Sequence, residues 1–290
     1  MKDALVINNM TLLKILKEND VSIVEEFSIM VDVLRKLAYK VILSDENFIE
    51  DIYNELHKNK NNEDIKSISM SFEKVFTFLR EIEHNEIIDN IKGTISKEDK
   101  KFQRALGNNQ LFNRGFTVIG YKLDDIEGIR NIYNLDAFKQ VLLIFCDKVN
   151  NINEFVNKIK IILFDLCFDE NIEESINDLN YGFNNRRKEI IYHLYCIDRE
   201  VPYIIKKYNG GYSKIGDMMS IECSPERNRN IVRNKLTKTI NGNSFNCELH
   251  TKMKKITNQA PDRIYFCPSI PSGICENTGQ IYIYKITKHI

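Results

Sequence analysis

Two histidines lie among lysines and arginines near the C-terminus. His250 belongs to the run Cys247-Glu-Leu-His-Thr-Lys-Met-Lys254, and His289 is the penultimate residue. Cleaving RNA without a metal requires a base for the 2′-hydroxyl, an acid for the leaving oxygen, and fixed cations around the phosphorane. Imidazole titrates near neutral pH, and ammonium and guanidinium groups bind phosphate. The predicted catalytic residues are His250, His289, Lys252, Arg263 and Lys288.

Aromatic and basic side chains occur in the same part of the chain. Flat aromatic rings are surfaces on which unpaired bases stack, and cations follow a nucleic-acid backbone. We therefore predict a nucleic-acid-binding surface formed by Tyr265, Tyr282, Tyr284, Lys254, Lys285 and Arg233.

The elements that must position these residues are strands. Alternating polar and apolar residues predict strands over Phe245–Ile256, Arg263–Cys267 and Gln280–His289, and Ser224-Pro225 predicts the start of a helix that ends near Ile240. Alternation places His250 on the same strand face as Lys252. A solvated sheet face with two unconnected histidines would give the same pattern, since exposed lysines also protect strands from aggregation.

The chain before residue 200 has a different character. It contains none of the five prolines and shows mainly helical periodicity, in runs that include Phe48–Leu56, Ile65–Ile87 and Ala137–Cys167. The β-branched segment Gly115–Tyr121 is the exception, and it predicts a short strand or a buried loop. We therefore expect a mainly α N-terminal domain over residues 1–205. A small α+β domain, an antiparallel sheet with one helix, follows over residues 206–290.

Formal charge divides at nearly the same place. Residues 201–290 carry 14 Lys and Arg against 6 Asp and Glu, whereas residues 1–200 carry 27 against 35, so a neutral chain contains parts of +8 and −8. A basic segment favours a polyanionic partner, and the acidic segment is suited to shielding it. Two solvated surfaces of chance composition would also give this contrast.

The C-terminal segment resembles the RelE/ParE-type toxin superfamily. The resemblance covers residues 215–290 and lies in the order strand, helix, three strands, with Asp262-Arg-Ile-Tyr-Phe266 in the penultimate strand and Tyr282-Ile-Tyr-Lys-Ile-Thr-Lys-His289 in the last. It implies a small sheet-and-helix fold and messenger-RNA cleavage without metal by scattered basic residues. Arg263 matches the arginine of the family's penultimate strand, and Lys288-His289 matches its basic end. The family usually has two helices before the sheet, whereas this sequence predicts one.

The leading functional hypothesis is accordingly a metal-independent endoribonuclease of the toxin or abortive-infection type, which acts in antiviral defence against phage. RNA is the expected partner, and no cofactor is expected. An antitoxin or inhibitory protein and a second copy of the chain are further candidate partners. The helical domain would sense, restrain or dimerise.

Two alternatives use the residues differently. In the first, the basic sheet catalyses nothing and only binds nucleic acid or a protein in defence or regulation. In the second, Arg186 and His193, seven residues apart and therefore on one helix face, resemble the Arg-x(4–6)-His motif of HEPN ribonucleases. A solvated arginine and a half-buried histidine would account equally well for that pair.

Several other classes lack their sequence signals. The chain has no phosphate-binding glycine loop, no nucleophile elbow and no paired-cysteine zinc spacing, so neither a nucleotide-hydrolase motif nor a zinc-site motif supports those functions. No apolar run has signal-peptide or membrane-span length. We therefore expect a cytoplasmic protein without membrane association, whose seven cysteines are thiols.

Overall fold

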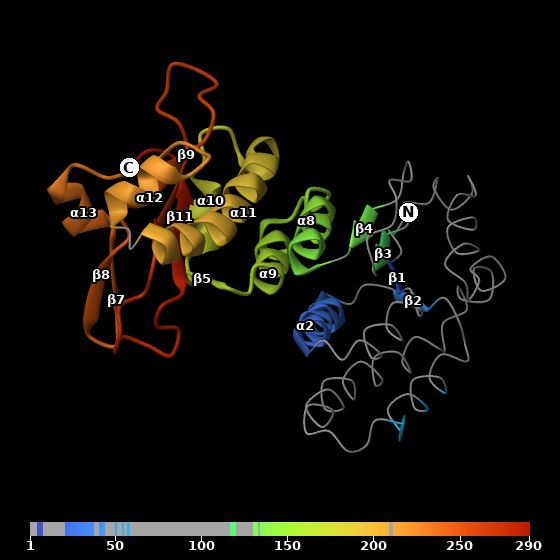
Figure 1. Ribbon diagram of the computed structural model, residues 1–290. Helices are drawn as coiled ribbons and strands as arrows, with labels where there is room; N and C mark the ends of the chain where they lie inside the picture. The colour runs from blue at the N-terminus through green and yellow to red at the C-terminus, as the bar shows by residue number, and fades with distance from the viewer. Residues whose placement is uncertain are drawn as a thin grey trace. The chain divides into compact units, whose positions relative to one another are not determined.

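The computed structural model describes residues 5–7, 21–37, 41–43, 50, 54, 57–58, 117–119, 130–132, 134–208 and 211–290. The chain forms two compact units, Met1–Val141 and Leu142–Ile290. Figure 1 labels their helices and strands. The overall class is α+β, as expected.

The first unit contains both helix and sheet. Helix α2 (Val21–Leu37) is amphipathic and buries Leu34 completely. Four short parallel strands, in the order β2-β1-β3-β4, accompany it: β1 (Leu5–Ile7), β2 (Val41–Leu43), β3 (Thr117–Ile119) and β4 (Arg130–Ile132).

Strand β3 confirms the strand predicted from the β-branched segment at residues 115–121. The other three strands were not predicted in the mainly α first domain, because strands of three residues are too short to show an alternating pattern. The predicted helical run at residues 65–87 lies outside the described residues, as does most of the run at residues 48–56.

A mixed five-stranded sheet organises the second unit. Its order is β5-β11-β10-β9-β6, and its strands are β5 (Leu166–Phe168), β6 (Cys223–Pro225), β9 (Leu249–Lys252), β10 (Arg263–Cys267) and β11 (Ile281–Thr287). Strand β5 pairs with β11 in parallel, and the remaining pairs are antiparallel. The expected all-antiparallel sheet is therefore corrected by one edge strand that comes from upstream of residue 206.

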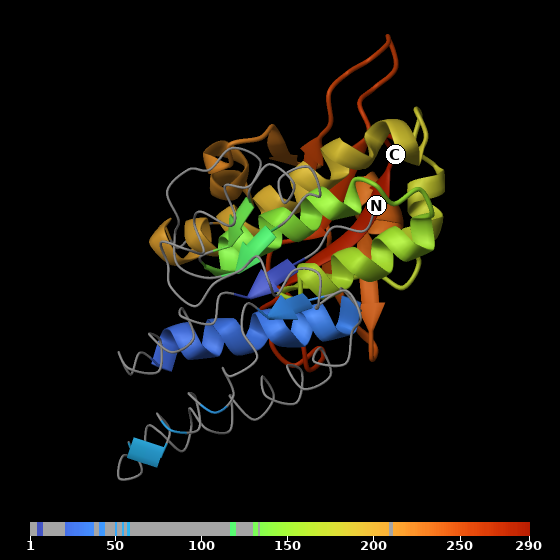
Figure 2. The ribbon, with the colours of Figure 1, turned by 90° about the vertical axis from the view of Figure 1, so that its right-hand side faces the viewer.

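Six helices are described between residues 135 and 235, and Figure 1 labels them. They are α8 (Leu135–Cys146), α9 (Ile152–Ile162), α10 (Ile172–Asn177), α11 (Phe183–Tyr208), α12 (Tyr212–Met218) and α13 (Arg229–Lys235), and the division between the units falls within α8. The segment between β9 and β10 is exposed over residues 254–260 and projects from the end of the sheet (Figure 2).

Helix α11 passes through the position where the sequence predicted a domain boundary. Pro202 costs the helix one backbone hydrogen bond. The helix continues because Val201 and Ile204, on either side of that proline, are buried at 0% and 3% exposure. Burying each such side chain contributes roughly 1.5–3 kcal/mol. The predicted boundary at residue 205 therefore falls inside α11 and inside the second unit.

The single helix predicted over residues 224–240 is replaced by shorter elements. Ser224 and Pro225 belong to β6, and Asn228 begins α13 by accepting hydrogen bonds from the amides of Asn230 and Ile231. A hairpin follows, formed by β7 (Thr237–Ile240) and β8 (Asn243–Asn246). Asn241 and Gly242 connect its strands with φ of 51° and 78°, the left-handed conformation that a two-residue hairpin turn requires.

The two faces of the sheet are covered by different elements. On one face Thr251 is fully buried, and its Oγ1 lies 2.9 Å from Nδ1 of His193 on α11. On the other face Tyr282 packs against Phe245 of the β7–β8 hairpin, with ring centroids 5.4 Å apart, in a cluster that includes Cys267. The hairpin therefore covers part of the face that carries the predicted site residues.

A buried ion pair joins α11 to the start of β10. Arg186 Nε donates to Asp262 Oδ2 at 2.8 Å, and the two side chains are 1% and 0% exposed. Arg186 Nη1 also donates to the backbone carbonyl of Lys254 at 2.9 Å. The same arginine therefore holds both ends of the segment that connects β9 with β10.

Within the described part of the chain, no helix is both long and apolar enough to cross a bilayer. The longest helix described, α11, carries charged residues along its length.

Replacing Asp262 by Asn should lower the free energy of unfolding by about 3 kcal/mol, because it removes the fully buried carboxylate from the Arg186 charge and leaves only the partly exposed Glu189 to balance it. Urea unfolding followed by circular dichroism measures the change. The matched control is Glu154→Gln, which removes a half-exposed partner of Lys158 and should cost well under about 1 kcal/mol. Equal losses from the two variants would contradict a stabilising role for the buried pair.

Candidate functional site

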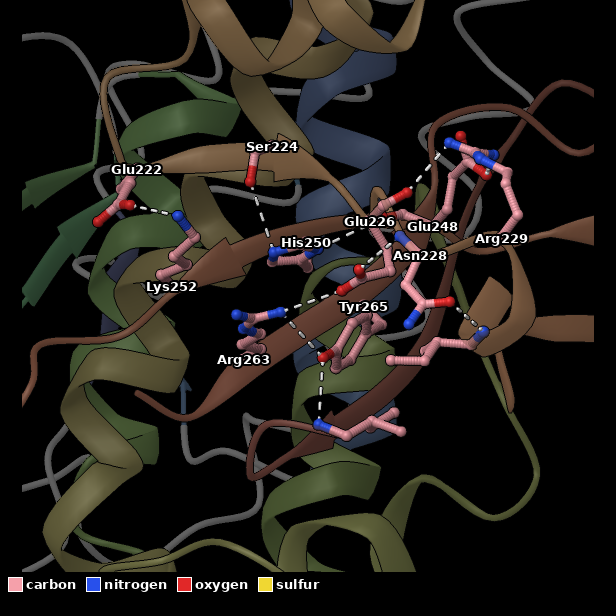
Figure 3. Close-up of polar contacts among 12 residues, drawn as sticks. Glu222, Ser224, Glu226, Asn228, Arg229, Glu248, His250, Lys252, Arg263 and Tyr265 are labelled. Atoms are coloured by element: carbon pink, nitrogen blue, oxygen red, sulfur yellow. Dashed lines mark hydrogen bonds and ion pairs between the residues drawn. The ribbon is translucent and has the colours of Figure 1, made fainter. Parts of the chain in front are cut away.

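The register of β9 with β10 places three of the predicted catalytic residues, His250, Lys252 and Arg263, on one sheet face. His250 of β9 lies opposite Tyr265 of β10, and Lys252 lies opposite Arg263. Directly paired residues in an antiparallel sheet project to the same side, as do residues two apart in a strand. Figure 3 shows these side chains converging, and we call His250, Lys252, Arg263, Tyr265 and Glu226 the sheet-face cluster.

His250 lies at the buried centre of the sheet-face cluster. Its side chain is 2% exposed, and its ring centroid is 5.2 Å from that of Tyr265. Nδ1 is 3.3 Å from the carbonyl oxygen of Glu248, and Nε2 is 3.5 Å from Ser224 Oγ. Burial, followed by the Arg263 guanidinium, lowers the pKa of His250 to about 4. The imidazole is therefore neutral at neutral pH.

Arg263 connects the sheet-face cluster to the segment before α13. Its Nη1 lies 3.4 Å from Glu226 Oε2 and donates to Tyr265 Oη at 3.4 Å. Burial raises the pKa of Glu226, but the hydrogen bond from the Asn228 amide and the neighbouring His250, Arg263 and His289 together lower it below its ordinary value. Glu226 is therefore a carboxylate that partly balances the arginine.

Lys252 lies at the rim of the same face, where it forms an ion pair with Glu222 at 2.5 Å. The lysine side chain is 25% exposed and the glutamate is 66% exposed. An ion pair with this much solvent exposure is weak, so a phosphate group that binds Lys252 can displace the Glu222 carboxylate.

His289 is exposed, unlike His250, and lies in the same electrostatic surroundings. Partial burial and the Arg263 guanidinium lower the pKa of His289, and the Lys252 ammonium acts in the same direction, while Glu226 opposes them. The same three charged groups act on the pKa of His250. The two imidazoles therefore share their charged neighbours, although His289 alone is accessible.

His289 also lines an open pocket of about 570 Å³ at the edge of β11. Strand β5 pairs with β11 only as far as Ile283. Beyond that point the amide of Ile286 donates instead to Ser175 Oγ on α10, at 3.0 Å. The residues of this terminal pocket are Asp169, Asn171, Glu174, Ser175, Asp178, Lys235, Lys238, Tyr284, Lys285, Thr287, Lys288, His289 and Ile290.

Three of the predicted residues besides His289 lie in the terminal pocket. Lys288 is exposed, while Lys285 and Tyr284 are half-buried, with the Lys285 ammonium 4.7 Å from the centre of the Tyr284 ring. Lys285 Nζ also donates to the backbone carbonyl of Lys235 at 3.4 Å. The predicted catalytic residues therefore divide between the sheet-face cluster and the terminal pocket, and His289 belongs to the surroundings of both.

Two of the predicted stacking surfaces are corrected by burial. Tyr265 is 0% exposed, and burial raises its pKa. Tyr282 is 6% exposed and donates its hydroxyl to Asp169 at 2.9 Å. Neither ring can stack on a base, because other side chains cover both rings. The strand alternation did not predict that the β7–β8 hairpin would fold over this face.

The two other predicted basic residues lie away from the pocket lining. Arg233 is exposed on α13, and Lys254 is exposed at the start of the projecting segment. The backbone of Lys254 is held from both sides, by Arg186 at its carbonyl and by Glu189 at its amide. A nucleic-acid backbone would meet these two side chains outside the pocket.

Arg186 and His193, the alternative site, do lie on one face of α11. That face packs against the sheet, so Arg186 is 1% exposed and His193 is 5% exposed. Arg186 is bonded to Asp262 and Glu189, and burial lowers the pKa of His193. The pair therefore holds the helix to the sheet, and the geometry does not favour a solvent-accessible HEPN-like site.

Sequence reasoning did not identify the acidic residues of the sheet-face cluster and of the terminal pocket. Glu226 lies three residues before α13, and Asp169 follows β5, where its carboxylate accepts from Lys238 at 2.8 Å. Neither residue has a motif around it. The signal that could have placed Glu226 was the capping residue Asn228, because a cap marks where the helix begins and the loop before it ends.

The described residues contain no group of three or more His, Cys, Asp or Glu side chains arranged to hold a metal ion. In the sheet-face cluster the Glu226 carboxylate faces the Arg263 guanidinium, and the His250 ring lies beside the Tyr265 ring. Both groups therefore have partners from within the chain.

Lowering the pH should destabilise the protein through His250. Its pKa is about 4 when folded and about 6.5 when unfolded, so the unfolded chain binds the extra proton between these values. The free energy of unfolding should therefore fall as pH decreases from 6.5 towards 4, by at most about 1.4 kcal/mol per pH unit for this group. Urea unfolding at several pH values between 4 and 6.5 measures this free energy. His250→Gln should flatten the slope, and a slope unchanged by that variant would contradict the assignment.

Comparison with family models, with curated proteins and with solved structures found no match to this chain. The resemblance to the RelE/ParE-type superfamily therefore stays a hypothesis about residues 215–290. The geometry of the sheet-face cluster and the terminal pocket is the basis for a functional proposal.

Proposed function

We propose that the second unit binds RNA in the terminal pocket and cleaves it without a metal, by acid–base catalysis at His289. The observation that carries the proposal is the placement of His289, an exposed imidazole that lines a pocket beside Lys285 and Lys288 and shares charged neighbours with the sheet-face cluster. An imidazole beside bound phosphate can withdraw the 2′-hydroxyl proton or supply one to the leaving oxygen.

The cations near His289 are suited to the charge that develops on the phosphate. Lys288 and Lys285 line the pocket with it, and Arg263 is close enough to affect its pKa. Fixed positive groups stabilise a phosphorane most where water is excluded, and Arg263 is only 9% exposed. The proposed roles are proton transfer by His289 and phosphate binding by Lys285, Lys288 and Arg263.

His250 has a different role from the one that its sequence position suggests. A side chain that is 2% exposed cannot meet an RNA hydroxyl without a movement of its surroundings. Its neutral ring packs at a tilt of 46° against the ring of Tyr265, whose hydroxyl accepts hydrogen bonds from Arg263 and from the Ile290 amide, the latter at 3.5 Å. We propose that His250 is a positioning residue, which holds Arg263 and the chain end next to His289.

The net charge gives weaker support than the sequence suggested. With the observed division, residues 142–290 carry 21 Lys and Arg against 17 Asp and Glu, a net charge of +4 rather than +8. The terminal pocket brings together four lysines, Lys235, Lys238, Lys285 and Lys288, beside the three carboxylates of Asp169, Glu174 and Asp178. Among the described residues, Lys235 and Lys288 form no ion pair, and these two exposed ammonium groups, not the charge of the whole unit, support the proposal.

The proposed biological setting is a toxin or phage-defence ribonuclease, as the RelE/ParE-type resemblance implies. Such an enzyme needs an inhibitory partner or an inactive state, and a second copy of the chain or a small antitoxin would provide it.

A second candidate function is RNA or protein binding without cleavage, and the burial of His250 favours it. With His250 covered, the sheet-face cluster offers no second accessible imidazole to serve as the opposite acid or base. The two candidates differ in a single observable, which is product formation.

The full-length protein should degrade single-stranded RNA in excess chelator, and His289→Gln should lower kcat by about 10²–10⁴-fold, the usual contribution of a general acid or base. Filter binding of the same RNA should change by less than about threefold, because His289 is uncharged above its lowered pKa. The matched control is His57→Gln, an exposed histidine of the first unit. RNA bound but never cut would favour the non-catalytic candidate.

The pH profile of cleavage provides an independent test. The pKa of His289 is lowered from 6.5, so a base at this position stays deprotonated and active at pH 6.5. The acidic limb of kcat/KM should therefore fall below pH 6.5. An acidic limb above pH 7 would assign the base to another group.

A further inference from the structure

The lining of the terminal pocket carries both charges, from different segments of the chain. We call Lys235, Lys285, Lys288 and His289 the lysine wall, and Glu174 and Asp178 of the α10 segment the carboxylate wall; the ion-paired Asp169 and Lys238 complete the charged lining. We propose that this pocket binds one unpaired nucleotide, with its phosphate on the lysine wall and a base that presents adjacent N–H donors, guanine above all, on the carboxylate wall. This inference rests on the proposed RNA-binding function and names the nucleotide that it selects.

The size of the pocket suits a single nucleotide. Its volume of about 570 Å³ falls within the range of roughly 300–1,000 Å³ in which small-molecule sites lie. A helical duplex is far wider than such a pocket. Proteins that read RNA sequence accordingly take one unstacked base into a pocket and contact its Watson–Crick edge.

The lysine wall is available to a ligand. Among the described residues, Lys288 and Lys235 form no ion pair with a carboxylate, and both are exposed. Lys238 differs, because its ammonium is bound to Asp169 at 2.8 Å and to Glu170 at 3.0 Å. A phosphate group would therefore be bound by Lys288 and Lys235, while Lys238 maintains the shape of the wall.

The carboxylate wall allows the pocket to distinguish a nucleotide from a simple anion. Glu174 and Asp178 are exposed, one helical turn apart, and no described cation pairs with either. Two such carboxylates would repel a free phosphate or sulfate. They would accept hydrogen bonds from a base instead, and guanine offers the two neighbouring donors N1–H and N2–H, which match the two oxygens of one carboxylate.

The ring of Tyr284 also lines the pocket. It is half-buried, with the Lys285 ammonium 4.7 Å from its centre, and it packs against the hydrophobic cluster that contains Phe245 and Tyr282. Tyr284 therefore holds Lys285 in place, and the carboxylates are the groups that select the base.

The test is equilibrium binding of guanosine monophosphate, uridine monophosphate and inorganic phosphate to the full-length protein. Guanosine monophosphate should bind about tenfold or more tightly than uridine monophosphate, since uracil has one N–H donor on that edge. The double variant Glu174→Gln with Asp178→Asn should bring the two nucleotides within about threefold of one another. Lys288→Gln should weaken both nucleotides equally, because it acts on the phosphate.

The matched control is Glu173→Gln, which removes a carboxylate of the same helix that does not line the pocket, and it should leave the preference unchanged. Equal binding of the two nucleotides, or binding of inorganic phosphate as tight as either, would reduce the pocket to an anion site and overturn the inference. No binding of guanosine monophosphate at millimolar concentration would also overturn it, and so would a pocket filled preferentially by an arginine- or lysine-containing peptide.

This experiment separates the inference from the proposed function. Selective binding of guanosine monophosphate without any RNA cleavage supports the nucleotide pocket and contradicts the ribonuclease. RNA cleavage without selective binding, and without a preference for cutting next to guanosine, supports the ribonuclease and contradicts the guanine pocket.

Discussion

The buried ion pair between Arg186 and Asp262 is the constraint on which the arrangement of the second unit depends. Removing two charges from water costs several kcal/mol for each, and that cost is recovered only where the partners meet with good geometry. The pair forms at 2.8 Å between a helix and the residue just before β10. It therefore fixes where β10 begins, and with it the side of the sheet to which Arg263 and Tyr265 project.

From that fixed start, the chemistry follows by strand register. Arg263 lies opposite Lys252 on one side and Thr287 on the other, so the three central strands present one row of polar groups. The β7–β8 hairpin covers the part of this face around Tyr282 with Phe245, whereas the part around Arg263 remains polar. The same geometry explains why His250 is buried while His289, beyond the end of β11, is exposed.

Strand β10, its neighbours and the polar face of β9 were predictable from sequence, because these strands are long enough to show alternation and are bounded by turn residues. The boundary between the two units was not predictable from sequence, because prolines usually end helices and Pro202 does not end α11. Burial of Val201 and Ile204 decides that outcome, and burial is a property of the packed fold. The hairpin has a local signal in Asn241-Gly242, the strongest short hairpin pattern, but the same two residues are also typical of the end of a helix.

In the candidate site, too, the sequence pattern predicts which strand face a residue lies on, whereas packing decides whether that residue is exposed. Alternation places His250 and Lys252 on one face correctly, yet it cannot distinguish a solvated face from a covered one. The ring of Tyr282 is covered by the hairpin residue Phe245, and that of Tyr265 lies beside His250 and Arg263, so neither is exposed as a stacking surface. Two carboxylates of the terminal pocket, Glu174 and Asp178, come from the α10 segment, more than a hundred residues before Lys285 and Lys288, which line the same pocket. The parallel pairing of β5 with β11 and the hydrogen bond from Ile286 to Ser175 bring those two segments together, and a three-residue strand leaves no periodicity from which that pairing could be inferred. The carboxylate wall follows from topology, and this is why the composition of the last ninety residues indicated a basic segment where the fold forms a pocket of both signs.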